Sequence, residues 1–76
     1  MNKIVNGDIF YVEKAVDKKM KKDTTWKVVK YDVRNKHYEL KNIDPKTKKE
    51  ISGRVAVSFD LIELEGMIRR HELSLV

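Results

Sequence analysis

The sequence has 76 residues, which is room for one domain spanning residues 1–76. It contains no cysteine, which excludes a disulfide-stapled fold, and no apolar run approaching the ~18 residues that cross a bilayer. Charged residues make up 38% of the chain and its net charge is +5, so we expect a heavily charged surface that attracts anionic partners. The first eight residues also lack the apolar segment of a secretory signal, and we therefore expect a cytoplasmic protein.

The N-terminal part of the chain predicts a strand followed by a loop. Asn6–Asp8 is a turn signal, and residues 9–16 after it are rich in the β-branched and aromatic side chains that strands favour. Residues 17–23 hold four lysines around Met20 and show no apolar periodicity. We expect this second segment to be a mobile loop.

The next segment predicts a hairpin. Residues 24–33 are good strand formers, but the face on which apolar side chains lie changes near Val28–Val29. Either both faces of this strand are partly buried, or a β-bulge switches its register. Residues 34–37 form a plausible hairpin turn, and residues 37–43 form a third strand with Tyr38 and Leu40 on its inner face.

A second connection, residues 44–49, begins with Asp44-Pro45, a strong turn starter. Residues 50–59 then show the clearest alternation in the chain and predict a fourth strand. Its predicted inner face carries Ile51, Val55, Val57 and Phe59. Gly53 falls on the same face, where it indicates a bulge or a close approach of another backbone.

After this strand the apolar spacing becomes helical over residues 61–68. Asp60 is placed to cap the helix, and Glu63 completes a capping box. Gly66 either ends the helix early or lies inside a slightly longer one. Residues 72–76 predict a short last strand with Leu73 and Leu75 directed inward.

The element order predicts a mainly β, small α+β fold: a five-stranded, partly open barrel with one short helix before the last strand. The chain resembles SH3-like barrels. The residues that carry this resemblance are Gly7-Asp8-Ile9-Phe10, Trp26-Lys27-Val28-Val29, Val55-Ala56-Val57 and Asp60–Leu64. Residues 59–76 are also similar to the ends of small proteins from phages and prophages of AT-rich Gram-positive bacteria, a resemblance that implies no specific activity.

The sequence shows no pattern of catalytic residues. Its two histidines, His37 and His71, lie in no nucleophile or metal motif, and its three glycines are too isolated to form a phosphate loop. Helix capping accounts for Asp60 and Glu63 without a metal ion. We therefore expect a protein that is not an enzyme and that needs no cofactor, metal or small-molecule substrate.

Three groups of residues mix positive charge with aromatic rings or loop positions, and they are the candidate binding site. Lysines suit phosphates, while exposed aromatic rings suit unpaired bases. The groups are Lys18, Lys19, Lys21 and Lys22; Trp26, Lys27, Lys30, Tyr31, Arg34 and Lys36; and Lys46, Lys48 and Lys49. A lone tryptophan on a strand is more often part of the core, and each lysine group also fits a solvated loop.

Two functions from different classes remain open. The first is a binding module that contacts nucleic acid, or an acidic protein that mimics it, through a basic β-face and lysine-rich loops. The second is a protein-interaction module or phage-type effector that covers a partner's surface, with a homodimer as a special case. Residues 1–50 carry 14 basic and 8 acidic groups while residues 51–76 carry 3 and 4, which favours nucleic acid and places it on the N-terminal part.

Overall fold

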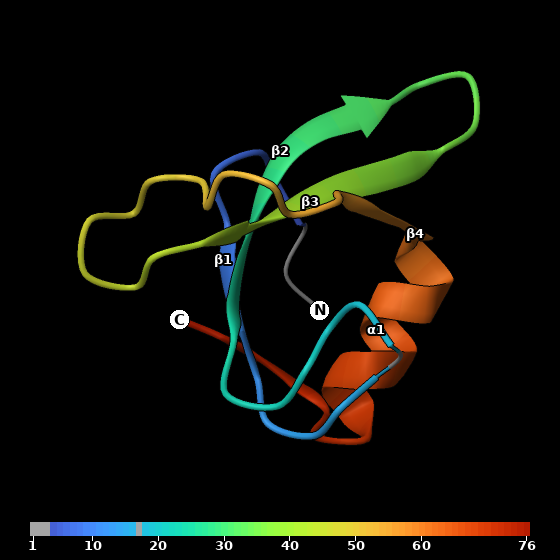
Figure 1. Ribbon diagram of the computed structural model, residues 1–76. Helices are drawn as coiled ribbons and strands as arrows, with labels where there is room; N and C mark the ends of the chain where they lie inside the picture. The colour runs from blue at the N-terminus through green and yellow to red at the C-terminus, as the bar shows by residue number, and fades with distance from the viewer. Residues whose placement is uncertain (1–3, 17) are drawn as a thin grey trace.

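The computed structural model describes residues 4–16 and 18–76, and its framework is an antiparallel sheet (Figure 1). Its elements are β1 (Ile9–Val12), β2 (Thr25–Asp32), β3 (His37–Ile43), β4 (Val57–Asp60), α1 (Leu61–Arg69) and β5 (Leu73–Leu75). The strand order is β4-β3-β2-β1-β5, which places β4 and β5 at the two edges. The sheet curls into a half-barrel, and α1 packs against both edge strands. The predicted mainly β fold with one short helix before the last strand is confirmed.

The β2–β3 hairpin is the region in which sequence and structure agree most closely. β3 has the predicted bounds, and Tyr38 and Leu40 are buried on its inner face. In β2, Trp26 and Val28 are buried as well, and the register against β3 shifts between Val28 and Lys30. This shift is the β-bulge that the change of face predicted, because one extra residue turns every later side chain to the opposite side.

The turn of this hairpin is organised by Asp32. One carboxylate oxygen accepts hydrogen bonds from the Arg34 and Asn35 amides at 3.0 and 3.3 Å, and the other accepts from the Asn35 side-chain amide at 2.8 Å. The hydrogen bond from the Asn35 side chain is the main reason that the pKa of Asp32 lies below its ordinary value. The left-handed position of the turn is Lys36, with a φ of 57°, rather than the asparagine.

The prediction of a strand over residues 50–59 is mostly wrong, because pairing with β3 is interrupted within this segment. Glu50 forms an isolated bridge with Ile43, and pairing resumes only where Val57 faces Leu40. Between these two contacts β3 advances by three residues while the facing chain advances by seven. The surplus residues leave the sheet, and we refer to this segment as the 51–56 excursion.

Two other predicted strand positions also differ. β1 ends at Val12 rather than at residue 16, because the chain bends at residues 13–14. In β5, Leu73 is buried as predicted, but Leu75 is 53% exposed at the end of an edge strand.

The helix begins where its capping residues predicted. The Glu63 amide donates to the Asp60 carboxylate at 2.8 Å, and the Asp60 amide donates to the Glu63 carboxylate at 3.0 Å. Gly66 lies inside the helix, and Leu64 and Met67 bury one side of it against the sheet. In the part of the chain that the structure describes, no helix is both long and apolar enough to cross a membrane.

The core lies between the concave face of the sheet, α1 and the loops at the ends of the half-barrel. Burial is complete or nearly so for a cluster that draws on every strand, the helix and two loops. Its members are Ile4, Phe10, Val12, Met20, Trp26, Val28, Tyr38, Leu40, Val57, Leu64, Met67 and Leu73. A domain of this size buries only about 60% of the surface of its unfolded chain, so each of these side chains matters to stability.

Candidate functional site

The lysine loop, residues 18–22, is held by a buried side chain at its centre. Met20 has no exposed surface and packs in the core cluster. Its carbonyl accepts a hydrogen bond from the Val16 amide at 3.2 Å. The predicted lack of regular structure holds for these residues, but the sequence pattern did not assign Met20 to the core; Asp17 lies outside the described residues. The burial of Met20 anchors the centre of the loop to the core, while the lysines on either side of it are exposed.

The C-terminal end of the lysine loop is tied to two strands. Asp23 has a φ of 67°, and its carboxylate accepts a hydrogen bond from the Tyr11 hydroxyl of β1. This bond favours the protonated phenol and raises the pKa of Tyr11. The neighbouring Thr24 hydroxyl accepts a hydrogen bond from the Trp26 indole at 2.8 Å, which links the loop to β2.

The 51–56 excursion contrasts with this loop because little connects it to the fold. The Ile51 amide still donates to the Asn42 carbonyl at 2.9 Å. Among the described residues, no backbone hydrogen bond joins residues 52–56 to any partner. Gly53 has a φ of 79°, which an extended strand does not contain, so the chain turns out of the sheet at this residue.

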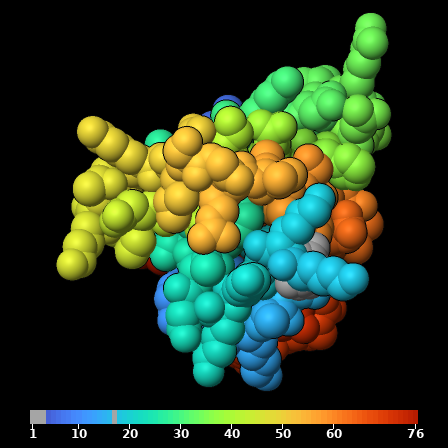
Figure 2. All heavy atoms as spheres, viewed as in Figure 1, coloured from blue at the N-terminus to red at the C-terminus, as the bar shows by residue number. Residues whose placement is uncertain are grey.

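The lysine loop and the 51–56 excursion together line a hollow of about 270 Å³, which we call the cationic pocket. It is lined by Lys18, Lys19, Lys21, Trp26, Gly53, Arg54 and Val55. None of these lining residues carries a carboxylate. Figure 2 shows the two segments on one face of the molecule, the loop in cyan and blue-green directly beside the excursion in gold.

Among the described residues, no ion pair neutralises the positive charge of Lys18, Lys21 or Arg54. Within residues 4–16 and 18–76, the ion pairs join Lys41 to Glu50 at 3.3 Å and Arg70 to Glu72 at 2.9 Å. Like charges gathered in one hollow repel one another, and a bound anion relieves that repulsion. The charge of the pocket is therefore suited to an anionic ligand.

The third basic group lies on the same face as the cationic pocket. Lys46, Lys48 and Lys49 are exposed on the connection between β3 and the excursion, seen in yellow in Figure 2. The connection turns as Asp44 predicted, since its carboxylate accepts a hydrogen bond from the Lys46 amide at 2.8 Å. Lys22 is also exposed, at the end of the lysine loop. These lysines extend the positive surface beyond the pocket.

Trp26 does not serve as an open stacking platform. Its side chain is 2% exposed, and it touches the cationic pocket only as a lining residue. A base needs an open ring face on which to stack. The inclusion of Trp26 as a stacking residue is therefore wrong, while the alternative that it belongs to the core is confirmed.

The other members of the second basic group are spread over different surfaces. Lys27 lies between the buried Trp26 and Val28, and Lys30 faces Glu39 after the bulge, so both lysines lie on the outer face of the sheet. Tyr31 follows the bulge and lies on the inner side, with its ring centroid 4.7 Å from that of the tyrosine facing it on β3. Arg34 and Lys36 are exposed at the hairpin turn. The aromatic and basic residues of the predicted β-face therefore do not share one face of the hairpin.

Arg54 is the charged pocket residue that is absent from the three predicted groups. The alternation of residues 50–59 places it on the face opposite Ile51 and Val55 of a regular strand, whereas the excursion brings it to the lysine loop. The signal that could have found it is Gly53, which indicates an irregularity at that point of the strand.

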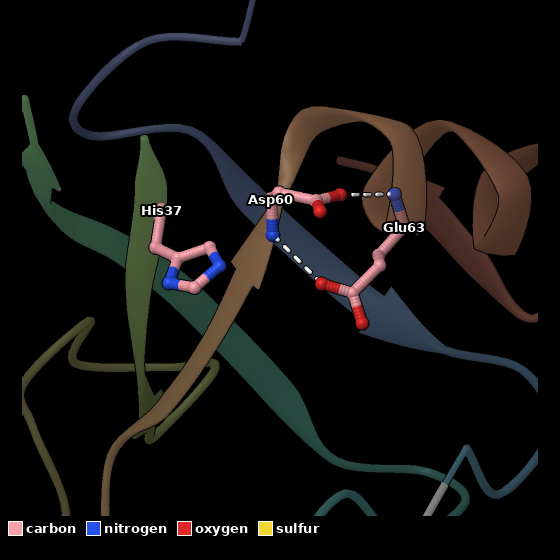
Figure 3. Close-up of side chains that lie close together, drawn as sticks. All are labelled: His37, Asp60 and Glu63. Carbon is pink, nitrogen blue, oxygen red and sulfur yellow. Dashed lines mark hydrogen bonds between the residues drawn. The ribbon is translucent and has the colours of Figure 1, made fainter. Parts of the chain in front are cut away.

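A second cluster of polar side chains lies where β3, β4 and α1 meet. His37 pairs across the sheet with Asp60, and ligand atoms of these two residues and Glu63 lie within 4.8 Å of one another (Figure 3). Both carboxylates already accept the capping hydrogen bonds of α1. The positive end of the helix dipole also disfavours a cation here, so the capping role explains this arrangement.

Comparisons of the chain with protein-family models, with curated proteins and with solved structures found no match.

Proposed function

We propose that this protein is a non-enzymatic module that binds nucleic acid through the cationic pocket. The observation that carries the proposal is the convergence of three lysines and one arginine, from two segments far apart in the sequence, on a hollow whose described lining residues include no carboxylate. Phosphate contacts by lysine and arginine supply most of the affinity in sequence-independent binding to nucleic acid. The neighbouring group Lys46, Lys48 and Lys49 extends the path that a chain of phosphates would follow.

The anchoring of the lysine loop supports this proposal. A flexible loop loses conformational entropy when it closes on a ligand, at a cost of about 1–2 kcal/mol for each residue that becomes ordered. Met20 and the hydrogen bonds at Asp23 already fix much of the loop in the free protein. The lysines are thereby arranged before the ligand arrives, which favours binding.

The test is a titration of fluorescently labelled single-stranded and duplex oligonucleotides, read by anisotropy at about 50 and 200 mM salt. We expect the triple variant K18A/K21A/R54A to bind more weakly than the wild type. We also expect its affinity for single strands to fall less steeply with salt, by a slope of about 0.7 for each phosphate contact that is lost.

The matched control is K27A/K30A/R34A, which removes the same charge from the outer face of the sheet and the hairpin turn. We expect it to reduce affinity much less than the pocket variant does. Equal losses in the two variants would show that binding follows net charge alone, and the pocket would then have no special role.

One observation favours a second function, the binding of a partner protein. β4 is an edge strand, and the backbone of residues 52–56 that leads into it has no hydrogen-bond partner among the described residues. An edge of this kind accepts an extended segment of another protein by main-chain pairing. Binding of that kind depends weakly on salt and survives the pocket substitutions, so the same variants separate the two functions.

A further inference from the structure

The lysines of the cationic pocket do not by themselves define which anionic group it would bind, and the backbone of the 51–56 excursion adds information on this point. Gly53 lines the cationic pocket in the left-handed region, yet nothing lies within 4 Å of the position that a Cβ atom would occupy. Glycine is therefore needed here for its backbone conformation and not to make room for a neighbouring group.

The amide groups of this turn lack partners. The N–H groups of Gly53 and Arg54 donate no hydrogen bond to any described residue. Both residues line the hollow that Lys18 and Lys21 also line. Backbone amides beside lysine and arginine side chains are the donor set with which proteins hold phosphate groups.

We propose that the cationic pocket holds a single phosphate group, with the Gly53 and Arg54 amides donating to its oxygens alongside the lysine side chains. This inference rests on the proposed function and names the chemical group that the site recognises. Ligand selection at the pocket then follows the phosphate and not the base, because Trp26 is too buried to stack. The same chemistry serves an internal phosphodiester, a terminal phosphate or a free phosphate compound.

The direct test uses inorganic pyrophosphate as the probe and the full chain labelled with ¹⁵N. We expect saturable amide shifts, with the Gly53 and Arg54 protons moving downfield as they donate to the anion. Sodium chloride at equal ionic strength is the control, and it should leave both resonances in place. A titration in which these two amides do not respond, or respond equally to chloride, would overturn the inference.

Substitutions at Gly53 test the role of the backbone conformation. Asparagine tolerates a positive φ, so we expect G53N to bind pyrophosphate within about threefold of the wild type. Valine strongly disfavours that region, so we expect G53V to bind about tenfold more weakly, the loss that one charge-assisted hydrogen bond accounts for. Binding by G53V that equals the wild type would contradict the inference. Circular dichroism and denaturant midpoints of both variants verify that each is folded.

Oligonucleotides that differ in one group identify the source of the phosphate. Preferred binding of a 5′-phosphorylated single strand over its 5′-hydroxyl counterpart indicates a terminal phosphate, whereas equal binding indicates an internal one.

The failure of the phosphate site and the failure of the nucleic-acid function give different results. If pyrophosphate binds at Gly53 and oligonucleotides do not bind, the phosphate site stands and the nucleic-acid function is wrong. If oligonucleotide binding needs the pocket but the Gly53 and Arg54 amides never respond, the nucleic-acid function stands and the phosphate site is wrong.

Discussion

The β2–β3 hairpin and the 51–56 excursion are both predicted to be strands and have very different structures. The hairpin is rich in strand-forming residues, and the excursion belongs to the segment with the clearest alternation in the chain. Val28 of the hairpin is fully buried, while Val55 of the excursion is 66% exposed. The difference shows that alternation predicts which side chains would share a face, but that only a paired neighbour turns that face into part of a core.

The largest effect on stability is expected from substitution of Met20, the buried side chain that anchors the lysine loop. The 51–56 excursion has no such anchor. M20A removes a fully buried side chain and should lower the free energy of unfolding by about 2–5 kcal/mol, measured by denaturant titration. M20L keeps the volume and is the control, with an expected cost below about 1.5 kcal/mol. A small effect of M20A would mean that the loop is not held by its centre.

Val28 and Val55 provide a matched test of the difference between the hairpin and the excursion. V28A should cost about 2 kcal/mol, because it removes two buried methyl groups and leaves a cavity. V55A should change the free energy of unfolding by no more than about 0.5 kcal/mol. Similar costs at both positions in the same denaturant experiment would mean that the excursion packs as a strand in solution.

The helix cap lies where regular structure resumes after the excursion. D60A removes the acceptor for the Glu63 amide and should cost about 1 kcal/mol. E63Q keeps an acceptor for the Asp60 amide, so it should cost clearly less in the same thermal or denaturant measurement. A larger loss in E63Q than in D60A would rule out the capping box as the source of the effect.

The smallest effect concerns the hairpin turn and its dependence on pH. The pKa of Asp32 is lowered from its ordinary value of 3.8, so its charged form stabilises the fold above about pH 4, and this contribution disappears as the pH falls through the lowered pKa. D32N keeps an acceptor oxygen but does not titrate. The difference in unfolding free energy between wild type and D32N should therefore shrink from pH 5 to pH 2, and a difference that stays constant would contradict this role.

Features that depend on neighbouring residues could be predicted from the sequence. The bulge at Val28–Val29 follows from a change in alternation, and the helix start follows from Asp60 and Glu63, three residues apart. The bounds of β3 follow in the same way from its own alternation and from the turns on either side. In each case the physical cause acts over a few residues.

The candidate site could be predicted only in part. The lysines of the loop were identified, but their partner Arg54 depends on where β3 stops pairing, and that is set by residues far apart in the sequence. The burial of Met20 depends on its packing in a core cluster whose other members lie far from it in the sequence, which no local pattern contains. His37 meets Asp60 through the cross-strand register for the same reason.

The pairing of β1 with β5 has a consequence for how the chain folds. Phe10 faces Leu75, so β1 gains its second neighbour only from a strand that lies more than 60 residues further along the chain. The β2–β3 hairpin closes over a short turn, whereas this contact must close a very long loop at a higher entropic cost. The pairing of β5 with β1 should therefore form more slowly than the hairpin does.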